Sequence, residues 1–252
     1  MYQELAEGGA TRFMAIFSPA TATEVGPVRS VREADVELVR QFGKIALGSS
    51  GGNGDVLATM NRAAAAGQLL DANFDRTPGA YRRAEKRKDA YNFYTSPALI
   101  DQARPGGDTG RDIGLRFGPA PAGMEPAGRA SIRFSPITRV SVVFDPETGR
   151  YDVFQDGDRM PGFRPANIVV QHVAVRDSPH VDSVGNRTPY TETVGGGAVS
   201  VLRSGMLLPG GWARPSAEVG TKLFDAARAD LPLEVGPTLF LLVPVGAELQ
   251  VG

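Results

Sequence analysis

The chain has 252 residues, which at roughly 150 residues per domain corresponds to between one and two domains. Its 27 basic and 28 acidic residues leave a net charge of -1, so the molecule as a whole has no electrostatic attraction to nucleic acid or to an anionic membrane surface. Cysteine is absent, which excludes disulfides, thiolate zinc sites and cysteine nucleophiles. With 42% hydrophobic residues and 31 glycines, the composition predicts a globular, loop-rich α+β protein.

The N-terminal part predicts strands that alternate with helices. Residues 13–17 form a short apolar run typical of a buried strand. Residues 30–33, Ser-Val-Arg-Glu, have the spacing of a capping box and predict a helix that Gly43 ends. Residues 44–47 predict the next strand and residues 55–66 the next helix. This succession indicates an α/β part.

Two segments follow before the chain becomes rich in glycine and proline. Residues 81–88 are strongly charged, which predicts an exposed turn or a short helix. Ser96 and Pro97 are the residue types favoured at the N-cap and the first position of a helix, here expected over residues 98–103.

The second half predicts mostly antiparallel strands. Residues 138–144 and 150–154 are β-patterned, and the Pro and Gly between them are typical of a hairpin turn. Further strands are expected over residues 167–175, 198–202 and 238–243, with one weak helix over residues 222–229. The predicted organisation is an N-terminal α/β domain over residues 1–110, a Gly/Pro-rich linker over 111–128 and a β-rich domain over 129–252.

The loop between the predicted strand 44–47 and the helix that follows is a candidate anion site. Gly48, Ser49 and Ser50 begin a glycine-rich turn whose backbone N–H groups, together with the helix dipole, suit a phosphate or carboxylate. The turn lacks the Lys-Ser/Thr ending of a P-loop, and Asp55 at the start of the helix would repel an anion. A flexible connection without a ligand is the alternative.

Three arginines form a second candidate. Arg12 immediately precedes the apolar run of residues 13–17, and Arg29 and Arg32 flank the predicted helix start. Together with Ser30 they could hold a phosphate or carboxylate through bidentate guanidinium contacts. The alternative is structural, with the arginines paired to nearby glutamates such as Glu4, Glu7 or Glu24.

Other residue types give no catalytic or metal signature. The two histidines, His172 and His180, match no metal-ligand spacing, and His172 within a predicted strand is more typical of a hydrogen-bonded sheet residue. The serines lack the context of a nucleophile elbow. Trp212 follows Pro-Gly-Gly, which suits either an aromatic contact loop or the core. No cofactor, metal or catalytic residue is expected.

Several motifs together resemble one bacterial family, the YerB-like lipoproteins, a two-part domain of unknown function. The resemblance rests on Glu-Gly-Gly-x-Thr-Arg-Phe from Glu7, on Gly-Pro-Val-Arg-Ser from Gly26 and on Asn-Phe-Tyr-Thr-Ser from Asn92. In the second half it rests on residues 151–157, 167–171, 197–212 and 235–238. The third motif adds Asn92 and Tyr94 to the candidate site residues. Tyr91 stands where the family has His, so no histidine chemistry is implied there.

The resemblance also implies a location. The family implies an export signal and a lipid-modified cysteine upstream, an extracytoplasmic position at the cell membrane and no assigned reaction. The abrupt start of the chain, which reads like the middle of a domain, agrees with an upstream segment that was removed. Membrane contact is expected only through that lipid anchor.

These observations favour a non-catalytic binding or scaffold protein of the cell envelope. It would recognise an anionic wall-associated ligand or a partner protein through the arginines and the glycine-rich loop. The alternative is a hydrolase or transferase that acts on a phosphorylated or glycan substrate with a carboxylate or Ser49 or Ser50. A third hypothesis is an interaction domain that offers an edge strand or the Trp212 loop.

Overall fold

The computed structural model describes residues 1–17, 22–85, 92–181 and 185–252. The chain forms two compact units. Unit 1 comprises Met1–Ala15, Gly114–Ser216 and Gly220–Gly252, and unit 2 comprises Ile16–Ile113 and Ala217–Val219. None of the helices in the described ranges is long and apolar enough to cross a membrane.

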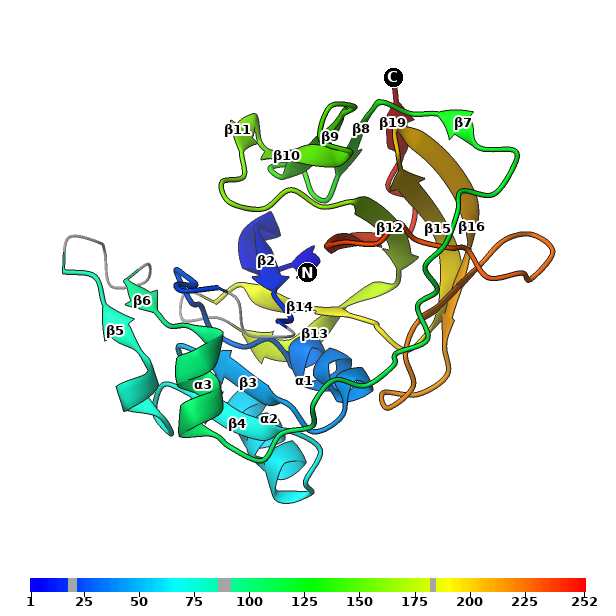
Figure 1. Cartoon of the computed structure of the whole chain (residues 1–252). Helices are drawn as coiled ribbons and strands as arrows, with labels where there is room; N and C mark the ends of the chain where they lie inside the picture. Colours follow the sequence, from blue (N-terminus) through cyan, green and yellow to red (C-terminus); the bar gives the residue numbers. More distant parts are fainter. Residues whose placement is uncertain (18–21, 86–91, 182–184) are drawn as a thin grey trace. The chain divides into compact units, whose positions relative to one another are not determined.

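Unit 1 is built around an eight-stranded sheet (Figure 1). In spatial order its strands are β17 (Lys222–Phe224), β16 (Met206–Arg214), β15 (Gly195–Arg203), β12 (Asn167–Val173), β18 (Thr238–Pro244), β1 (Tyr2–Leu5) and β2 (Thr11–Met14), and β7 (Glu125–Pro126) pairs with β16. The central strands β12 and β18 run parallel and are almost wholly buried. The apolar run of β18, from Leu239 to Val243, is typical of a strand that is buried on both faces.

A second, five-stranded sheet completes unit 1. Its spatial order is β11 (Asp158–Arg159), β10 (Arg150–Gln155), β9 (Arg139–Asp145), β8 (Arg129–Arg133) and β19 (Leu249–Val251). A separate hairpin pairs β13 (Val175–Val181) with β14 (Arg187–Thr191).

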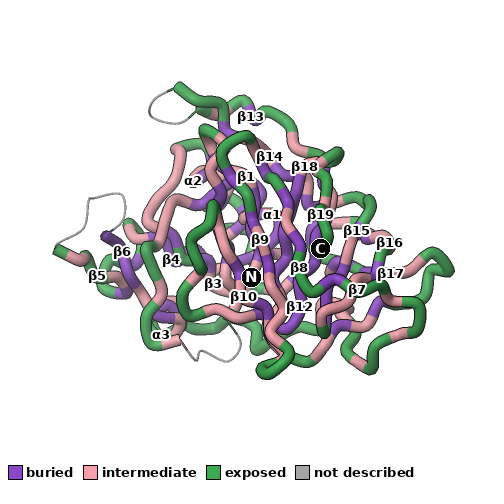
Figure 2. Tube along the Cα trace, turned by 90° about the horizontal axis from the view of Figure 1, so that it is seen from above, coloured by how far each residue is buried: buried purple, intermediate pink, exposed green. Residues whose placement is uncertain are grey.

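The two sheets of unit 1 share one apolar core. Ile132 and Val153 of the smaller sheet belong to the same buried cluster as Ile168 and Leu239 of the larger sheet. Figure 2 shows the strands of this unit in purple where their residues are buried, with green turns between them. Each fully buried aliphatic side chain contributes about 1.5–3 kcal/mol to the free energy of folding. The shared core therefore joins the sheets into one unit.

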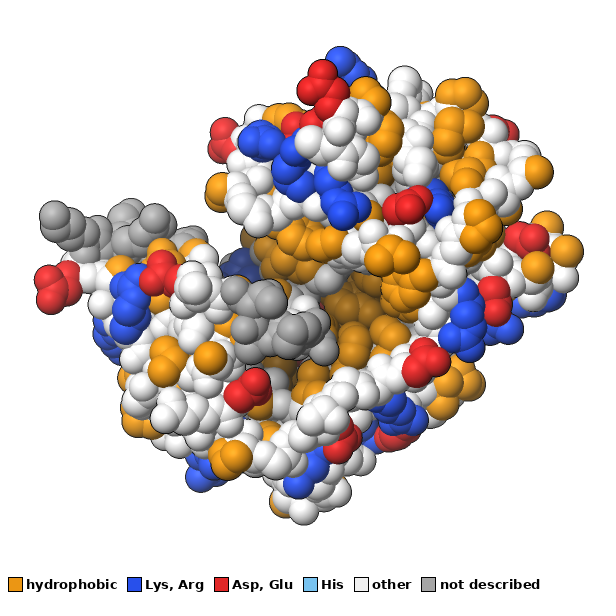
Figure 3. Space-filling model, in the orientation of Figure 1, with side chains coloured by type: hydrophobic (Ala, Val, Ile, Leu, Met, Phe, Trp, Pro, Cys, Tyr) orange, Lys and Arg blue, Asp and Glu red, His pale blue; other side chains and the backbone are white. Residues whose placement is uncertain are grey.

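Charged side chains of both signs gather over strands β9 to β11, at the top of the view in Figure 3. Arg164 donates hydrogen bonds to Asp145 and to Asp152, each at 2.7 Å, and Arg159 donates to Asp152 at 2.6 Å. These contacts fasten the segment after β11 onto the β9–β10 hairpin.

Unit 2 contains a parallel strand pair with its crossover helix. Strand β3 (Ala46–Ser49) leads through the glycine-rich loop into α2 (Gly54–Ala65), and the chain returns as β4 (Leu70–Asn73), parallel to β3. The other elements of unit 2 are α1 (Glu33–Leu38), the 3-10 helices η2 (Val39–Phe42) and η3 (Pro78–Ala80), the short strands β5 (Arg82–Arg83) and β6 (Phe93–Tyr94), and α3 (Pro97–Ala103).

The predicted α+β class, an α/β part followed by mostly antiparallel strands, agrees with this architecture. The predicted hairpin is β9 and β10, the strands expected over 198–202 and 238–243 lie within β15 and β18, and the strand expected over 167–175 is β12, which ends at Val173. Ser96 caps α3, because its Oγ accepts a 3.3 Å hydrogen bond from the Leu99 backbone N–H. Gly43, with a φ of 84°, ends η2.

The compact units differ from the expected domain limits at the N-terminus. Residues 1–15 belong to unit 1 rather than to the α/β part, because β1 pairs in parallel with β18 and β2 pairs with β1. The expected buried strand over residues 13–17 is correspondingly shorter: β2 ends at Met14, and Phe13 and Phe17 remain about 40% exposed.

Two local predictions are wrong. The helix after residue 30 begins at Glu33, and its capping carboxylate belongs to Asp35, whose Oδ2 accepts a 2.8 Å hydrogen bond from the Arg32 backbone N–H. Ser30 does not cap it, because the adjacent Val31 pairs with the glycine-rich loop and keeps this stretch extended.

The second error concerns the weak helix expected over residues 222–229. Residues Lys222–Phe224 form β17, because the neighbouring strand β16 supplies their hydrogen-bond partners. The chain then turns around Asp225, whose Oδ1 accepts hydrogen bonds from the Ala227 and Ala229 backbone N–H groups, each at 2.9 Å.

Candidate functional site at the carboxyl edge of β3 and β4

The candidate site lies where β3 and β4 end in unit 2. Because these strands are parallel, their carboxyl ends Ser49 and Asn73 lie directly opposite each other at one edge. The loops that leave such an edge are the usual place for ligands in sheets with parallel strands. We refer to this region, with the glycine-rich loop after Ser49 and the turn after Asn73, as the carboxyl edge.

The glycine-rich loop is held beside the first arginine segment. The Ser50 backbone N–H donates a 3.1 Å hydrogen bond to the Arg29 carbonyl oxygen, and the Val31 N–H donates a 2.9 Å bond to the Gly51 carbonyl oxygen. A Cβ at Gly52 would lie 2.9 Å from a Val31 methyl carbon, so the close approach requires glycine there. The backbones of residues 29–31 and 50–52 therefore lie side by side.

The same arginine segment also pairs with β6. The Val28 N–H donates a 2.8 Å hydrogen bond to the Phe93 carbonyl oxygen, and Val25 and Thr95 exchange backbone hydrogen bonds. Residues 25–31 thus connect the glycine-rich loop to the strand that carries Tyr94 and follows Asn92.

The structure accordingly gathers most of the residues proposed from the sequence into adjoining segments of unit 2. These are Arg29, Ser30, Arg32, Gly48, Ser49, Ser50, Asn92 and Tyr94. Arg12 lies on β2 in unit 1, where its Nη1 donates a 3.0 Å hydrogen bond to the Thr11 carbonyl oxygen. Tyr91 lies outside the described residues.

The guanidinium of Arg32 forms hydrogen bonds to the backbone of the two residues before it. The side chain is 9% exposed, and its Nη1 donates to the carbonyl oxygens of Ser30 at 3.1 Å and Val31 at 3.4 Å. These bonds brace the entry to α1. The expected partners of the arginines have other contacts as well: Glu24 pairs with Arg82, and Glu7 accepts a hydrogen bond from Thr188.

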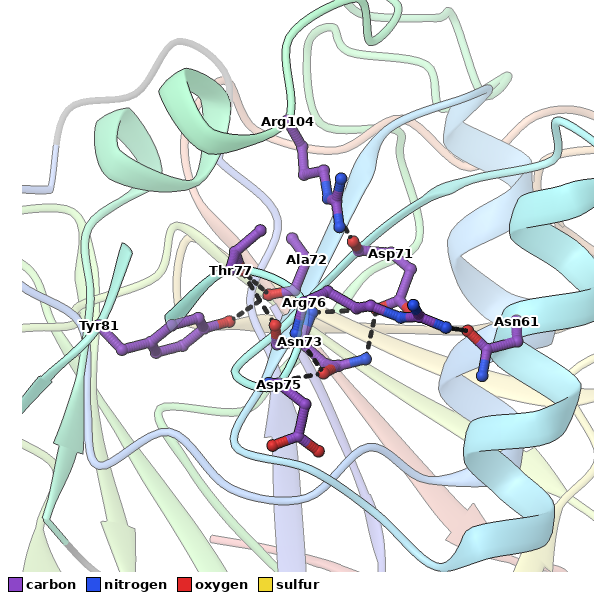
Figure 4. A network of polar contacts seen from close by, with 9 residues as sticks. All are labelled: Asn61, Asp71, Ala72, Asn73, Asp75, Arg76, Thr77, Tyr81 and Arg104. Atoms are coloured by element: carbon purple, nitrogen blue, oxygen red, sulfur yellow. Dashed lines mark hydrogen bonds and ion pairs between the residues drawn. The ribbon is translucent and has the colours of Figure 1, made fainter. Parts of the chain in front are cut away.

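A polar network at the end of β4 was not predicted (Figure 4). Asp71 Oδ1 accepts hydrogen bonds from the backbone N–H of Asn73 at 3.0 Å and from its side-chain amide at 2.7 Å. Thr77 Oγ1 donates to the Ala72 carbonyl oxygen at 3.0 Å, and Arg104 Nε donates to the Asp71 carbonyl oxygen at 2.7 Å. In the sequence, the signal for this network was the set of polar residues at the end of an apolar stretch. In the fold, these residues lie across the parallel strand pair from the glycine-rich loop.

Two buried oxygens at this edge lack hydrogen bonds. Ser49 and Asp71 are 1% and 7% exposed, and neither Ser49 Oγ nor Asp71 Oδ2 has a hydrogen-bond partner in the described chain. Asp71 Oδ2 lies 3.9 Å from Arg76 Nε, which forms an ion pair with it. Side chains alternate along a strand, so the register places Ser49, Asp71 and Asn73 on one face of the pair.

Tyr81 closes the opposite face. Its hydroxyl donates a 2.6 Å hydrogen bond to the Ala72 carbonyl oxygen. Burial raises the pKa of Tyr81 well above its usual value, the charge of Asp71 adds to this, and a hydrogen bond from the Ser49 backbone opposes it. The phenol therefore stays protonated and acts as a fixed donor at the edge.

Strand β5 carries two arginines, and each stacks on an aromatic ring of β6. Arg82 lies over Tyr94, with 4.8 Å from its Cζ to the ring centroid, and Arg83 lies over Phe93 at 4.4 Å. Arg83 is also 5.7 Å from the ring of Phe74, whose backbone N–H bonds to the Ser49 carbonyl oxygen at 2.8 Å. The charged stretch at 81–88, expected as a turn or helix, thus begins with a strand, and residues 86–88 lie outside the described residues.

The remaining sequence candidates lie in unit 1. Trp212 belongs to strand β16 rather than to a loop, is 3% exposed and donates a 2.8 Å hydrogen bond to the His172 carbonyl oxygen. Burial lowers the pKa of His172. Within the described ranges, no three His, Asp or Glu side chains gather as a metal-binding group.

Two family models match successive parts of the chain. Residues 1–109 match the N-terminal domain, and residues 130–239 the C-terminal domain, of a family described as protein of unknown function (DUF3048). A crystal structure of the YerB protein from Bacillus subtilis is similar, with a TM-score of 0.78 and 23% sequence identity over 99% of this chain and 85% of that chain. At this identity the likeness shows a common fold. A search of curated proteins finds no match. The chain therefore belongs to the two-part, YerB-like DUF3048 family of unknown function.

Proposed function

We propose that the chain is a non-catalytic binding domain that recognises an anionic wall-associated ligand at the carboxyl edge of unit 2. The observation that carries this proposal is the pairing of residues 29–31 with the glycine-rich loop at the ends of two parallel strands. It brings a basic segment to the place where the fold favours a ligand. Oxyanions suit such a place because guanidinium and backbone N–H groups bind them directly.

Two features favour binding over catalysis at this edge. Tyr81 is a phenol with a raised pKa, fixed by its hydrogen bond to Ala72, and so it stays protonated and does not readily donate its proton to a substrate. The carboxylate of Asp71 is buried and engaged by Asn73 and Arg76 rather than directed at an open site.

The extracytoplasmic location is part of the proposal and rests on the family resemblance. Fractionation of cells that express the native protein, with mass spectrometry of its N-terminal peptide, tests the location. A membrane-bound protein with a lipidated cysteine is the expected result. An unlipidated protein in the cytosol would contradict it.

Co-sedimentation with purified cell-wall sacculi tests the binding function. The chain is expected to sediment with intact sacculi and to be released by salt, because the contacts are ionic. Arg29→Gln is expected to weaken sedimentation while the melting temperature stays within a few degrees. The matched control is Arg62→Gln, at an exposed position of α2, which should bind like the unaltered chain. If the unaltered chain stays in the supernatant with every sacculus preparation, the proposed function is wrong.

A further inference from the structure

Arg82 and Arg83 form a contrasting pair on the β5–β6 ribbon. They are neighbours on β5, and their side chains point to opposite faces of the β5–β6 ribbon because successive residues of a strand alternate. Each guanidinium lies over an aromatic ring of β6, Tyr94 for Arg82 and Phe93 for Arg83. Each side chain therefore packs against the ring of its cross-strand neighbour.

Their electrostatic surroundings differ. Arg82 forms an ion pair with Glu24, and its Nε also donates a 3.0 Å hydrogen bond to that carboxylate. Arg83 is exposed, and no carboxylate in the described parts of the chain lies within ion-pair distance of it. Among the described residues, Arg83 thus presents a cation without a paired carboxylate, stacked on an aromatic support.

The position of Arg83 connects it to the carboxyl edge. Its guanidinium lies near both Phe93 and Phe74, and these two rings pack edge to face with centroids 4.7 Å apart. Phe74 directly follows β4, and its backbone N–H bonds to the Ser49 carbonyl oxygen. The support of Arg83 is therefore fixed to the end of the strand pair.

We propose that Arg83 is a contact residue for the ligand of this edge, and that the group it binds is an oxyanion of an anionic wall polymer. This inference rests on the proposed function and adds the recognising residue and the ligand chemistry. A guanidinium stacked on a ring holds its N–H donors around its rim, where a phosphate or carboxylate accepts two of them at once. The aromatic support restricts the side chain before binding, so less conformational entropy is lost when the ligand binds.

The test compares Arg83→Gln with Arg82→Gln in co-sedimentation with sacculi. Loss of a charge-assisted contact is expected to weaken binding by Arg83→Gln about ten- to a hundredfold, whereas Arg82→Gln should change it by less than about threefold. Arg83→Gln loses its cation–π contacts with Phe93 and Phe74, and Arg82→Gln loses one such contact and the ion pair with Glu24, so both melting temperatures should fall by small amounts. Arg83→Lys, which keeps the charge and loses the fork, should bind with intermediate affinity.

Two sacculus preparations identify the source of the oxyanion. Removal of phosphate-containing polymers abolishes the difference between Arg83→Gln and the unaltered chain if the group is a phosphate. Amidation of carboxylates abolishes it if the group is a carboxylate. A difference that survives both treatments overturns the assignment of an oxyanion.

A soluble probe separates this inference from the proposed function. Inorganic phosphate is titrated into the whole chain labelled with ¹⁵N at arginine, and the Arg83 Nε signal, assigned by its loss in Arg83→Gln, is expected to shift more than that of Arg82. If the unaltered chain binds no sacculi and Arg83 still responds, the wall function is wrong and the anion contact stands. If sacculi bind the Arg83→Gln and unaltered chains equally, the proposed function stands and the role of Arg83 is wrong.

Discussion

The hydroxyl of Tyr81 lies directly over Gly48, in the space that a side chain at residue 48 would occupy. A Cβ built at Gly48 would come within 2.9 Å of Tyr81 Oη and 3.3 Å of the Ile100 Cδ1 carbon. The phenol can reach the Ala72 carbonyl oxygen on the adjacent strand only because residue 48 has no side chain. The glycine thus serves packing at the carboxyl edge as well as the adjacent loop.

Gly48→Ala is therefore expected to lower the free energy of unfolding by about 1–3 kcal/mol, since the added methyl group displaces Tyr81 or Ile100. Urea unfolding measures the change. The matched control is Gly54→Ala, where no heavy atom lies within 4 Å of the added carbon, and it should be neutral or stabilising by up to about 1 kcal/mol. Equal midpoints for Gly48→Ala and the unaltered chain would show that the contact with Tyr81 imposes no constraint.

Tyr151 predicts a loss of stability in alkali. Burial raises its pKa from 10.0 to about 12, although a hydrogen bond from the Gly205 backbone opposes the shift. The unfolded chain therefore loses this proton first. The associated stability is present below pH 10 and is lost progressively as the pH rises from 10 to about 12.

Denaturant unfolding between pH 9 and pH 12 checks this prediction, with Tyr151→Phe as the comparison. The variant should be less stable at pH 9, because the Gly205 N–H loses its acceptor, and its stability should fall less steeply above pH 10. Parallel curves for the two proteins would show that Tyr151 titrates normally.

Asp145 predicts a corresponding effect in acid. The hydrogen bond from Arg164 is the main cause that lowers the pKa of Asp145 from 3.8 to about 2, and Thr148 contributes through a further hydrogen bond. The unfolded chain binds this proton first as the pH falls. The stabilising contribution is thus present above pH 3.8 and is lost as the pH falls from 3.8 to about 2.

The measurement is an NMR titration of the Asp145 carboxyl in Arg164→Gln, where its pKa should rise toward the ordinary value. Arg159→Gln is the control, because Arg159 contacts Asp152 instead. A carboxyl that still titrates near pH 2 in Arg164→Gln would assign the shift to other groups.

Replacement of the buried Arg203 is expected to destabilise the fold. Its side chain is 2% exposed and donates to the Pro232 carbonyl oxygen at 2.8 Å and to Glu234 at 2.6 Å. Arg203→Leu should lower the free energy of unfolding by about 2–4 kcal/mol, because the Pro232 carbonyl loses the donor of a buried side chain and Glu234 its ion partner. The exposed Arg159 serves as the control, and Arg159→Leu should cost less than about 1 kcal/mol in the same denaturation experiment.

Much of the local structure could be predicted from neighbouring residues. The hairpin of β9 and β10, the cap of α3 at Ser96 and the stop at Gly43 each depend on contacts within a few residues. The errors arose where a distant segment competed with the local preference. Val31 pairs with the glycine-rich loop and moves the helix start from Ser30 to Glu33, and strand β16 draws Lys222–Phe224 into the sheet.

By itself, the sequence determined the family, the α+β class and the segments from which a candidate site could be assembled. Only the tertiary structure decided that β1 joins the sheet of the second half beside β18, that Asp71 lies at the same edge as Ser49, and that Arg83 rests on Phe74 and Phe93. The physical reason is the distance along the sequence between the residues that make contact. Turns and helix ends are fixed by hydrogen bonds between near neighbours, whereas the register between distant strands is set by which apolar faces are buried together.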